Sequence, residues 1–314
     1  MKKDKIIFPA VTQNLMPHMS PYIRISPFIA REWARILKAS SPRTSPADNP
    51  RFWLDNAVDM KYYDSGRRAL WACLKHLHLK PADNVLILTT TNGPYISGCV
   101  TQTIEKVCRW TRTLTPKTKL VLVIHEFGFP CPAEKIIPCT KLGIPVLEDC
   151  AYAFGSRVEG AGIGRHGDFG LYSFTKYFPI PLGGLLVAKE KINKSASALK
   201  IPSPAEGLLR RTINHSLPYL KDWNKTRRAF WREYAAALQK HGFFPYFPLR
   251  EKIVPGVYLT KVPARFDGEI VKKKLNTRGV ESTQYYHQGG FYFPCHQFLT
   301  DYERAYILRQ FLYR

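Results

Sequence analysis

The stretch LEDCAYAFGSRVEGAGIGRHGDFGLYSFTK, residues 147–176, decides the fold of this chain of 314 residues. An apolar strand, expected over Ile144–Glu148, runs directly into an acid, Asp149. A second strand is expected over Phe169–Phe174, and one lysine, Lys176, follows it. Because both strands are apolar without alternation, they are typical of a sheet that is covered on both faces. The stretch therefore predicts an acid and a lysine at neighbouring strand ends.

The segments around this stretch alternate between strand and helix patterns. The pair Gly183-Gly184 leads into a further apolar strand at Leu185–Ala188. Upstream, strands are expected at Val85–Leu88 and Lys119–Ile124, and helices at Ile29–Ala39, after Ser65-Gly66, at Tyr95–Val107 and at Pro132–Lys141. Such alternation is typical of an α/β fold with a mostly parallel sheet.

A change of pattern near residue 200, marked by Pro202 and Pro204, suggests a domain boundary. We expect an N-terminal segment plus a large domain over residues 1–200, and a smaller C-terminal α/β domain over residues 201–314. In the smaller domain, a helix around Phe230–Leu238 should turn its apolar stripe to the core rather than to a membrane. Further strands are expected at Val257–Val262 and Val280–Tyr286, and helices at Gly268–Thr277 and Thr300–Leu312.

An acid and a lysine at neighbouring strand ends suit the chemistry of pyridoxal 5'-phosphate (PLP). The amine of Lys176 can form a Schiff base with the cofactor aldehyde, and Asp149 can keep the pyridine nitrogen protonated, so that the ring accepts electrons. Two simpler interpretations stay open, with Lys176 as a surface lysine and Asp149 as the N-cap of a following helix. The placement of Lys176 between Ser173 and the glycine pair favours the cofactor site.

The charge of the chain favours anionic partners. Lys and Arg total 47 against 24 Asp and Glu, which gives a formal net charge of +23. Phosphorylated small molecules suit such a surface, but the charge is spread along the chain, so a solvated basic surface without a partner explains it equally well. Binding to nucleic acid explains the charge less well than either of these.

The cysteines and the hydropathy pattern argue against a metal-binding protein and against a membrane protein. The seven cysteines contain no CxxC pair, so we expect no metal site and reduced thiols in a cytoplasmic protein. Cys150 is expected to be a small buried residue rather than a nucleophile. No stretch is long and apolar enough to span a membrane, so we expect no membrane partner.

Several motifs occur in the order found in one enzyme family. They are Ser65-Gly66, KLVLVIHEFGFP at 119–130, EDCAYAFG at 148–155, GDFGLYSFTK at 167–176 and LGG at 182–184. In these motifs the chain resembles the DegT/StrS sugar aminotransferases, from about Ser65 to Ala188 and more weakly to its end. The resemblance implies the PLP-binding fold of aspartate aminotransferase, fold type I.

The resemblance also assigns roles to single residues. Lys176 matches the lysine that forms the Schiff base, and Asp149 matches the acid on the pyridine nitrogen. The cofactor phosphate is expected at a helix start, where free N–H groups and the helix dipole favour an anion. Its expected contacts are Ser65, Gly66, Arg67 and Ser173, with Asn214 reaching in from a partner subunit.

Two tyrosines complete the expected cofactor site. Tyr152 takes the place of a His or Gln that lies beside the phenolic oxygen of the cofactor, and core packing is an equal alternative for it. Tyr95 is a candidate for stacking on the cofactor ring. His125 and Glu126 end a strand at the edge where open α/β sheets bind ligands, and we favour a role in shaping the local loop or a subunit interface over a catalytic one.

The implied function is transfer of an amino group, from glutamate as the expected donor, to a nucleotide-linked keto sugar by a homodimer. One alternative is a PLP-dependent sugar dehydratase or lyase, although that branch of the family typically has histidine in place of the lysine. Another is a non-catalytic binding or regulatory relative, because the segment from Cys108 to Lys119 is shorter than in the family.

Overall fold

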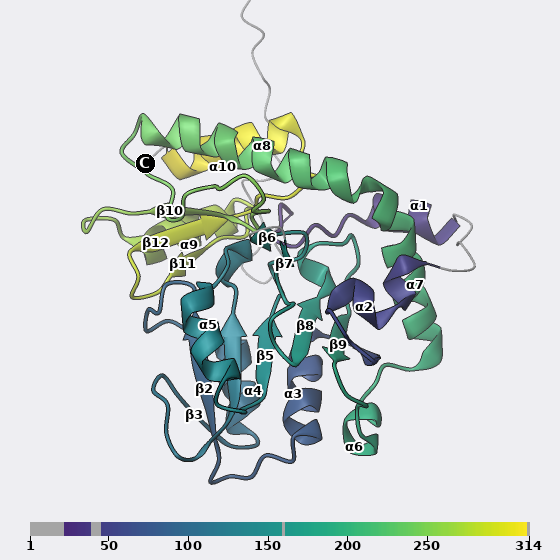
Figure 1. Ribbon diagram of the computed structural model, residues 1–314. Coiled ribbons are helices and arrows are strands. Elements are labelled where there is room, and N and C mark those ends of the chain that lie inside the picture. Colours follow the sequence, from purple (N-terminus) through teal and green to yellow (C-terminus); the bar gives the residue numbers. More distant parts are fainter. Residues whose placement is uncertain (1–21, 39–44, 159–160, 313–314) are drawn as a thin grey trace, which may run out of the picture.

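A computed structural model describes residues 22–38, 45–158 and 161–312. Its larger sheet has seven strands in the order β1-β9-β8-β5-β4-β2-β3 (Figure 1). Strands β3, β2, β4, β5 and β8 run parallel, and β9 is antiparallel to β8 and β1. The bounds are β1 Asp59–Tyr63, β2 Asn84–Thr89, β3 Arg109–Thr111, β4 Thr118–Ile124, β5 Val146–Asp149, β8 Phe169–Ser173 and β9 Gly184–Ala188. The predicted α/β class with a mostly parallel sheet is confirmed.

Helices cover both faces of this sheet, which explains why its central strands are apolar throughout. Helices α3 (Gly66–His76) and α4 (Gly98–Glu105) pack on one face, against Leu122 and Leu147 among others. Helix α5 (Ala133–Thr140) packs on the other face against Val121. Further elements at the margins are α1 (Ala30–Lys38), α2 (Pro50–Trp53), α6 (Lys194–Ser197) and the hairpin of β6 (Arg157–Val158) and β7 (Ala161–Gly162).

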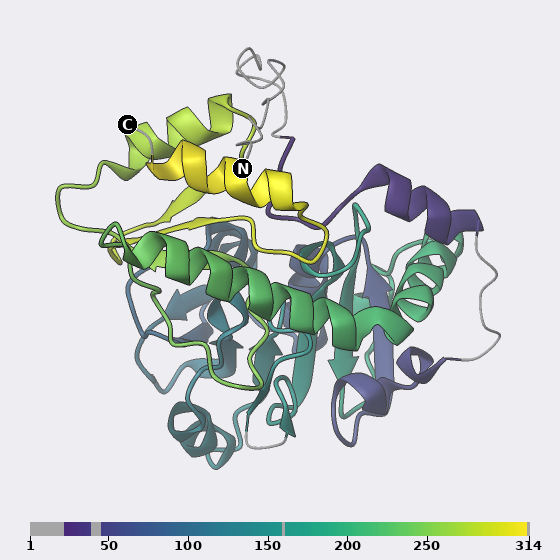
Figure 2. The same ribbon diagram turned by 90° about the horizontal axis from the view of Figure 1, so that it is seen from above.

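A smaller antiparallel sheet lies towards the C-terminus. Its order is β10-β12-β11, with bounds β10 Tyr258–Lys261, β11 Thr283–Tyr285 and β12 Gly290–Phe293. Helices α8 (Leu220–Gln239), α9 (Gly268–Thr277) and α10 (Asp301–Leu312) supply its core. Trp231, Tyr234 and Leu238 of α8 are buried there, so the apolar stripe of this helix faces the core as predicted. Figure 2 shows α8 extending beyond the small sheet and over the large one.

Several elements differ from the sequence predictions. Helix α4 begins at Gly98 and not near Tyr95, because the segment with Asn92, Gly93 and Pro94 before it forms a loop. Strands β1 and β12 were missed. Helix α7 (Ser203–Ser216) was also missed, since its Pro204 and Gly207 weaken the helical pattern. Its Leu209 and Ile213 pack in the core of the large sheet, and the boundary at residue 200 stays a prediction.

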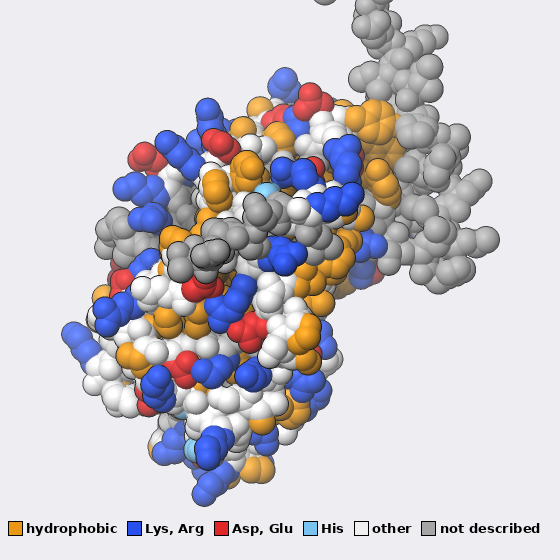
Figure 3. Space-filling view, turned by 90° about the vertical axis from the view of Figure 1, so that its right-hand side faces the viewer, with side chains coloured by type: hydrophobic (Ala, Val, Ile, Leu, Met, Phe, Trp, Pro, Cys, Tyr) orange, Lys and Arg blue, Asp and Glu red, His pale blue; other side chains and the backbone are white. Residues whose placement is uncertain are grey.

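Positive charge is dispersed over the face of the molecule shown in Figure 3. Lys and Arg side chains are scattered over the face in Figure 3, with acidic and apolar side chains between them. Among the described residues, no helix is long and apolar enough to cross a bilayer.

Candidate active site

A cavity of about 210 Å³ lies at the carboxyl ends of β2, β4, β5 and β8, where the topology of an open α/β sheet favours ligand binding. It is bounded on one side by the start of α3 and on another by residues of the small sheet. The predicted site residues that line it are Gly66, Arg67, Tyr95, Asp149, Tyr152, Ser173 and Lys176. Ser65 and Asn214 are not in its lining.

Lys176 ends the short 3₁₀ turn η4 (Phe174–Lys176) that follows β8. Its Nζ lies 5.0 Å from the centroid of the Tyr152 ring, within the range of a cation–π contact. Tyr152 raises the pKa of Lys176, and desolvation of the amine acts in the opposite direction. The lysine is therefore a pocket residue, and the interpretation as a surface lysine is wrong.

Asp149 ends β5 and lies in register between Ile124 of β4 and Leu171 of β8. The acid and the lysine thus come from neighbouring strands, as predicted. Burial raises the pKa of Asp149, and one hydrogen bond, from the Ala151 N–H to Oδ1 at 2.9 Å, acts against this. In the described part of the chain, no cationic side chain pairs with Asp149, and a turn rather than a helix follows it. The N-cap interpretation is therefore wrong.

The start of α3 meets the end of β8 at the pocket. Ser65 is the N-cap of α3, and its Oγ accepts a hydrogen bond from the Arg68 N–H at 3.2 Å. A Cβ added to Gly66 would lie 3.1 Å from the Cβ of Ser173. The first N–H groups of the helix, which lack intrahelical partners, thus lie beside a serine hydroxyl at the pocket wall. This arrangement suits an anion such as a phosphate.

The glycine pair is explained by the same contact. Gly183 forms a bridge with Ser65, and its N–H donates to the Asp64 carbonyl at 2.6 Å. Gly183 has a φ of +118°, and a Cβ on Gly184 would lie 2.3 Å from the Ser65 carbonyl oxygen. A side chain at Gly184 would therefore move the start of α3, and one at Gly183 would meet the Leu209 and Phe174 side chains at a φ that favours glycine.

We expect Gly184→Ala to destabilise the protein by about 1–3 kcal/mol through this overpacking. PLP affinity should also fall, because the start of α3 would be pushed from Ser173. Gly207→Ala is the matched control, since a Cβ there meets nothing within 4 Å in α7. It should stabilise the helix by up to about 1 kcal/mol. Urea denaturation of both variants measures the difference, and equal stabilities would contradict the steric account.

The remaining two predicted residues differ in placement. Tyr95 lies in the loop before α4, with its ring edge-on to Tyr285 at 5.4 Å between centroids. It lines the pocket, and its stacking on a cofactor ring stays a prediction. Asn214 lies in α7, is only 8% exposed and does not reach the pocket of its own chain. Its expected contact from a partner subunit also stays a prediction.

The part of the pocket wall that comes from the small sheet was not predicted from the sequence. Tyr285 and Tyr292 line the pocket together with Glu126. The Glu126 carboxylate is buried and accepts hydrogen bonds from the Thr91 N–H at 2.7 Å, the Thr91 hydroxyl at 2.9 Å and the Tyr285 hydroxyl. Glu126 could be recognised in the sequence as an acid at a strand end, but its partner Tyr285, 159 residues away, could not.

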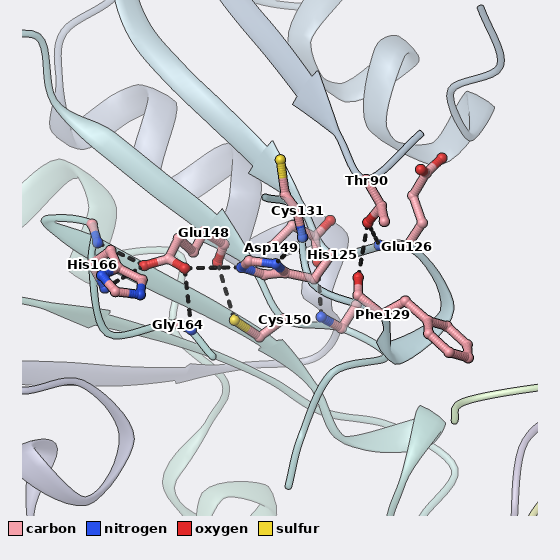
Figure 4. A network of polar contacts seen from close by, with 12 residues as sticks. Thr90, His125, Glu126, Phe129, Cys131, Glu148, Asp149, Cys150, Gly164 and His166 are labelled. Atoms are coloured by element: carbon pink, nitrogen blue, oxygen red, sulfur yellow. Dashed lines mark hydrogen bonds and ion pairs between the residues drawn. The ribbon is translucent and has the colours of Figure 1, made fainter. Parts of the chain in front are cut away.

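Behind the pocket, Glu148 centres a buried polar network (Figure 4). Successive strand residues point to opposite faces, so Glu148 faces away from Asp149. Its carboxylate is 0% exposed and accepts hydrogen bonds from the N–H groups of Gly164, His166 and Gly167 at 3.2, 2.7 and 2.6 Å. The ring of His125 contacts the same carboxylate, with 2.9 Å between Nε2 and Oε2.

The geometry assigns the proton of His125. Its Nδ1 accepts a hydrogen bond from the Cys131 N–H at 3.1 Å, so the ring proton lies on Nε2 and is donated to Glu148. Burial by itself would raise the pKa of Glu148, but the hydrogen bonds from His125 and Gly167 more than offset it and hold this pKa low. His125 thus shapes the loops around the site, which is the role that its place at the strand end predicts.

We expect Glu148→Gln to destabilise the fold by about 3 kcal/mol, because every contact of this carboxylate is a donor and an amide N–H would face another donor. Glu134→Gln, at an exposed acid on α5, is the control and should change little. The pKa of Glu148 lies below its ordinary 4.5, so its contribution is present above pH 4.5 and is lost as pH falls through the lowered pKa. Wild type and Glu148→Gln should therefore converge in unfolding free energy in acid; a constant difference would contradict this origin.

Cys150 has the buried position that the sequence predicted. All seven cysteines are free thiols, and Cys150 is 1% exposed with its pKa raised by burial. Within the described ranges, no group of three or more His, Cys, Asp or Glu residues could hold a metal ion.

Known proteins resemble the chain in sequence around this site. Residues 102–205 match the DegT/DnrJ/EryC1/StrS aminotransferase family. GDP-perosamine synthase of Escherichia coli O157:H7 is 38% identical over 143 residues, which are 40% of this chain and 39% of that protein. A UDP-N-acetyl-3-dehydro-alpha-D-glucosamine 3-aminotransferase of Acidithiobacillus ferrooxidans is 31% identical over 35% of this chain and 34% of its own length. The chain thus matches little more than a third of these curated relatives.

Solved structures share the fold over most of the chain. PseC of Helicobacter pylori, an aminotransferase involved in the biosynthesis of pseudoaminic acid, aligns with a TM-score of 0.68 at 14% identity, over 92% of this chain and 98% of that one. Spr1654 of Streptococcus pneumoniae in its PLP form aligns with a TM-score of 0.67 at 17% identity, over 95% and 97%. At these identities the likeness to solved structures shows the fold. In sequence, residues 102–205 of the chain are similar to the DegT/DnrJ/EryC1/StrS aminotransferase family.

Proposed function

We propose that the protein is a PLP-dependent aminotransferase that moves an amino group from glutamate to a nucleotide-linked keto sugar. The observation that carries this proposal is the convergence of Asp149 and Lys176, from neighbouring strand ends, in one pocket. An unpaired buried carboxylate and a lysine amine are the two groups that this cofactor chemistry requires.

The residues of the pocket fit PLP in three respects. Asp149 is buried and has no cationic partner among the described side chains, so a pyridinium N–H would supply the missing one. The start of α3 beside Ser173 offers N–H groups and a hydroxyl to a phosphate. Tyr95 and Tyr152 line the same pocket, with the Tyr152 ring beside the Lys176 amine. When bound, PLP supplies an aldehyde that links to a primary amine and a ring that withdraws electrons.

The chain's own residues then have distinct tasks. When PLP is bound, the Lys176 amine, held beside the Tyr152 ring, would take the proton from the amino-bearing carbon of glutamate and deliver it to the aldehyde carbon of the cofactor. With the keto sugar it would move a proton in the opposite direction. The Asp149 carboxylate would hold a proton on the ring nitrogen of the cofactor. Tyr285 and Tyr292 cover the pocket from the small sheet and exclude water from it.

The substrate class rests on the relatives. Two of them are named for nucleotide sugars, as GDP-perosamine synthase and as an aminotransferase of a UDP-linked sugar. The basic surface, with a formal net charge of +23, favours such an anionic substrate. We further propose a homodimer in which Asn214 of one subunit contacts the cofactor phosphate of the other, and a cytoplasmic location, which the seven free thiols support.

The test combines purified protein, PLP, glutamate and a panel of nucleotide-linked keto sugars. We expect PLP binding, conversion of the bound cofactor to pyridoxamine phosphate on addition of glutamate, and its return with one sugar of the panel. Elimination of water from the sugar without this conversion would point to a dehydratase. A failure to bind PLP at any pH would overturn the proposal and leave a non-catalytic relative.

A further inference from the structure

The turn that carries Lys176 is held from outside by three side chains. In a short 3₁₀ turn the last carbonyl groups have no partners within the turn itself. Here the carbonyl oxygens of three consecutive residues each accept a hydrogen bond from a distant element. Ser26 Oγ donates to the Thr175 carbonyl at 2.7 Å, Arg227 Nη2 to the Lys176 carbonyl at 3.1 Å, and Gln297 Nε2 to the Tyr177 carbonyl at 2.9 Å.

Arg227 and Gln297 act together in this arrangement. Arg227 Nε donates to Gln297 Oε1 at 2.6 Å, so the amide is oriented with its N–H₂ towards Tyr177. The Arg227 guanidinium also lies 4.6 Å from the centroid of the Tyr177 ring. One rigid fork and one amide thus fix two adjacent carbonyl groups and the ring between them.

The burial of Arg227 is unusual because its charge has no acid beside it. It is 1% exposed, and burial lowers its pKa. Arg304, which is buried to a similar degree, pairs with Glu233 at 2.8 Å and Asp301 at 2.9 Å. In the described part of the chain, no carboxylate pairs with Arg227, and its partners are neutral oxygens and a ring. Burying such a cation costs free energy, so stability alone does not account for it.

We propose that Arg227 and Gln297 are positioning residues that hold the Lys176 turn so that its amine lies in the pocket. Arg227 comes from α8 and Gln297 from the segment before α10, both beyond residue 200. Figure 2 shows α8 lying across the large sheet, and the hydrogen bond from Arg227 to the Lys176 carbonyl brings this helix to the turn. The elements around the small sheet therefore fix the lysine as well as covering the pocket. This inference rests on the proposed role of Lys176 in holding PLP.

The variants are Arg227→Met, Arg227→Lys and Gln297→Ala, with Arg228→Met as the matched control. Arg228 is the next residue of α8, and its Nη1 also donates to backbone carbonyls, those of Arg250 and Ile253, both at 2.7 Å. It does not touch the Lys176 turn. Comparing the two arginines thus separates the loss of a side chain-to-backbone contact from the loss of this particular one. Gln297→Ala keeps the buried charge and serves if the Arg227 variants do not fold.

Two measurements report on the turn. The first is the rate at which added PLP becomes covalently attached to Lys176, trapped with borohydride and mapped by peptide mass spectrometry. It should fall roughly 10- to 100-fold in the Arg227 and Gln297 variants, in line with the effect of misplacing a reacting group. Arg227→Lys should recover little of the wild-type rate, because one ammonium group cannot replace the two N–H donors of the guanidinium. Arg228→Met should stay within about twofold of wild type.

The second measurement needs no cofactor. The N–H groups of Tyr177 and Phe178 donate to the Phe174 carbonyl at 3.1 and 2.8 Å, so amide hydrogen exchange of this peptide reports on the turn. Exchange there should accelerate in the Arg227 and Gln297 variants and not in Arg228→Met. If these variants lose thermal stability but react with PLP and exchange as wild type does, the residues are structural only and the inference fails. If wild type itself does not attach PLP, the proposed function fails instead.

Discussion

Replacing Lys176 with alanine is expected to lower kcat at least about 10³-fold, because the variant loses the group that moves the proton. The covalent attachment of PLP should also disappear. Lys176→Arg should be as inactive, although it keeps the positive charge over Tyr152, since a guanidinium stays protonated and is no nucleophile. Comparing the two variants shows whether activity needs the amine of Lys176 or only its positive charge.

The control for this prediction is Lys191→Ala, at an exposed lysine outside the pocket. Steady-state kinetics and borohydride trapping measure all three variants. Residual attachment of PLP to Lys176→Ala at the wild-type level would show that another amine holds the cofactor.

Replacing Asp149 with asparagine is expected to lower kcat by about 10²–10³-fold, because a neutral amide cannot hold a proton on the ring nitrogen. The cofactor-free variant should be at least as stable as wild type. Burial raises the pKa of Asp149, so the folded state favours its protonated form and the ionised carboxylate costs stability at neutral pH. Loss of activity without loss of stability identifies a residue kept for function.

Asp168→Asn is the matched control for Asp149→Asn. Asp168 also accepts one backbone hydrogen bond, from the Val146 N–H at 2.9 Å, but it lies outside the pocket. Thermal melting and steady-state kinetics should show little change for this control. An Asp149→Asn variant that melts well below wild type and keeps its kcat would assign Asp149 a structural role.

The sequence predicted the centre of the site well because two strong signals coincide there. Strands covered on both faces read as unbroken apolar runs, so the ends at Asp149 and Ser173 were visible within a residue. The helix start at Ser65 was marked by its N-cap. Because the carboxyl ends of parallel strands lie at one edge of a sheet, the position of the pocket could be predicted from these strand ends.

The other parts of the site could not be predicted, because they depend on contacts between residues far apart in the chain, which produce no local sequence pattern. The hydrogen bond from Arg227 to the Lys176 carbonyl joins residues 51 positions apart, and the one from Gln297 to Tyr177 spans 120. Any donor side chain at the right place in the fold could make them. Strand β12 was missed for another reason, because the turn before it, with His287 at a φ of 58° and Gly289 at 61°, lies within one short aromatic run. The small sheet's part of the wall was therefore not foreseen.

The most direct test of the central claim is to titrate purified protein with PLP, reduce it with borohydride and locate the cofactor by peptide mass spectrometry. We predict one modified site, Lys176, with the attachment lost in Lys176→Ala and retained in Lys191→Ala. Attachment at another lysine, or no attachment across the pH range in which the protein is folded, would contradict the account.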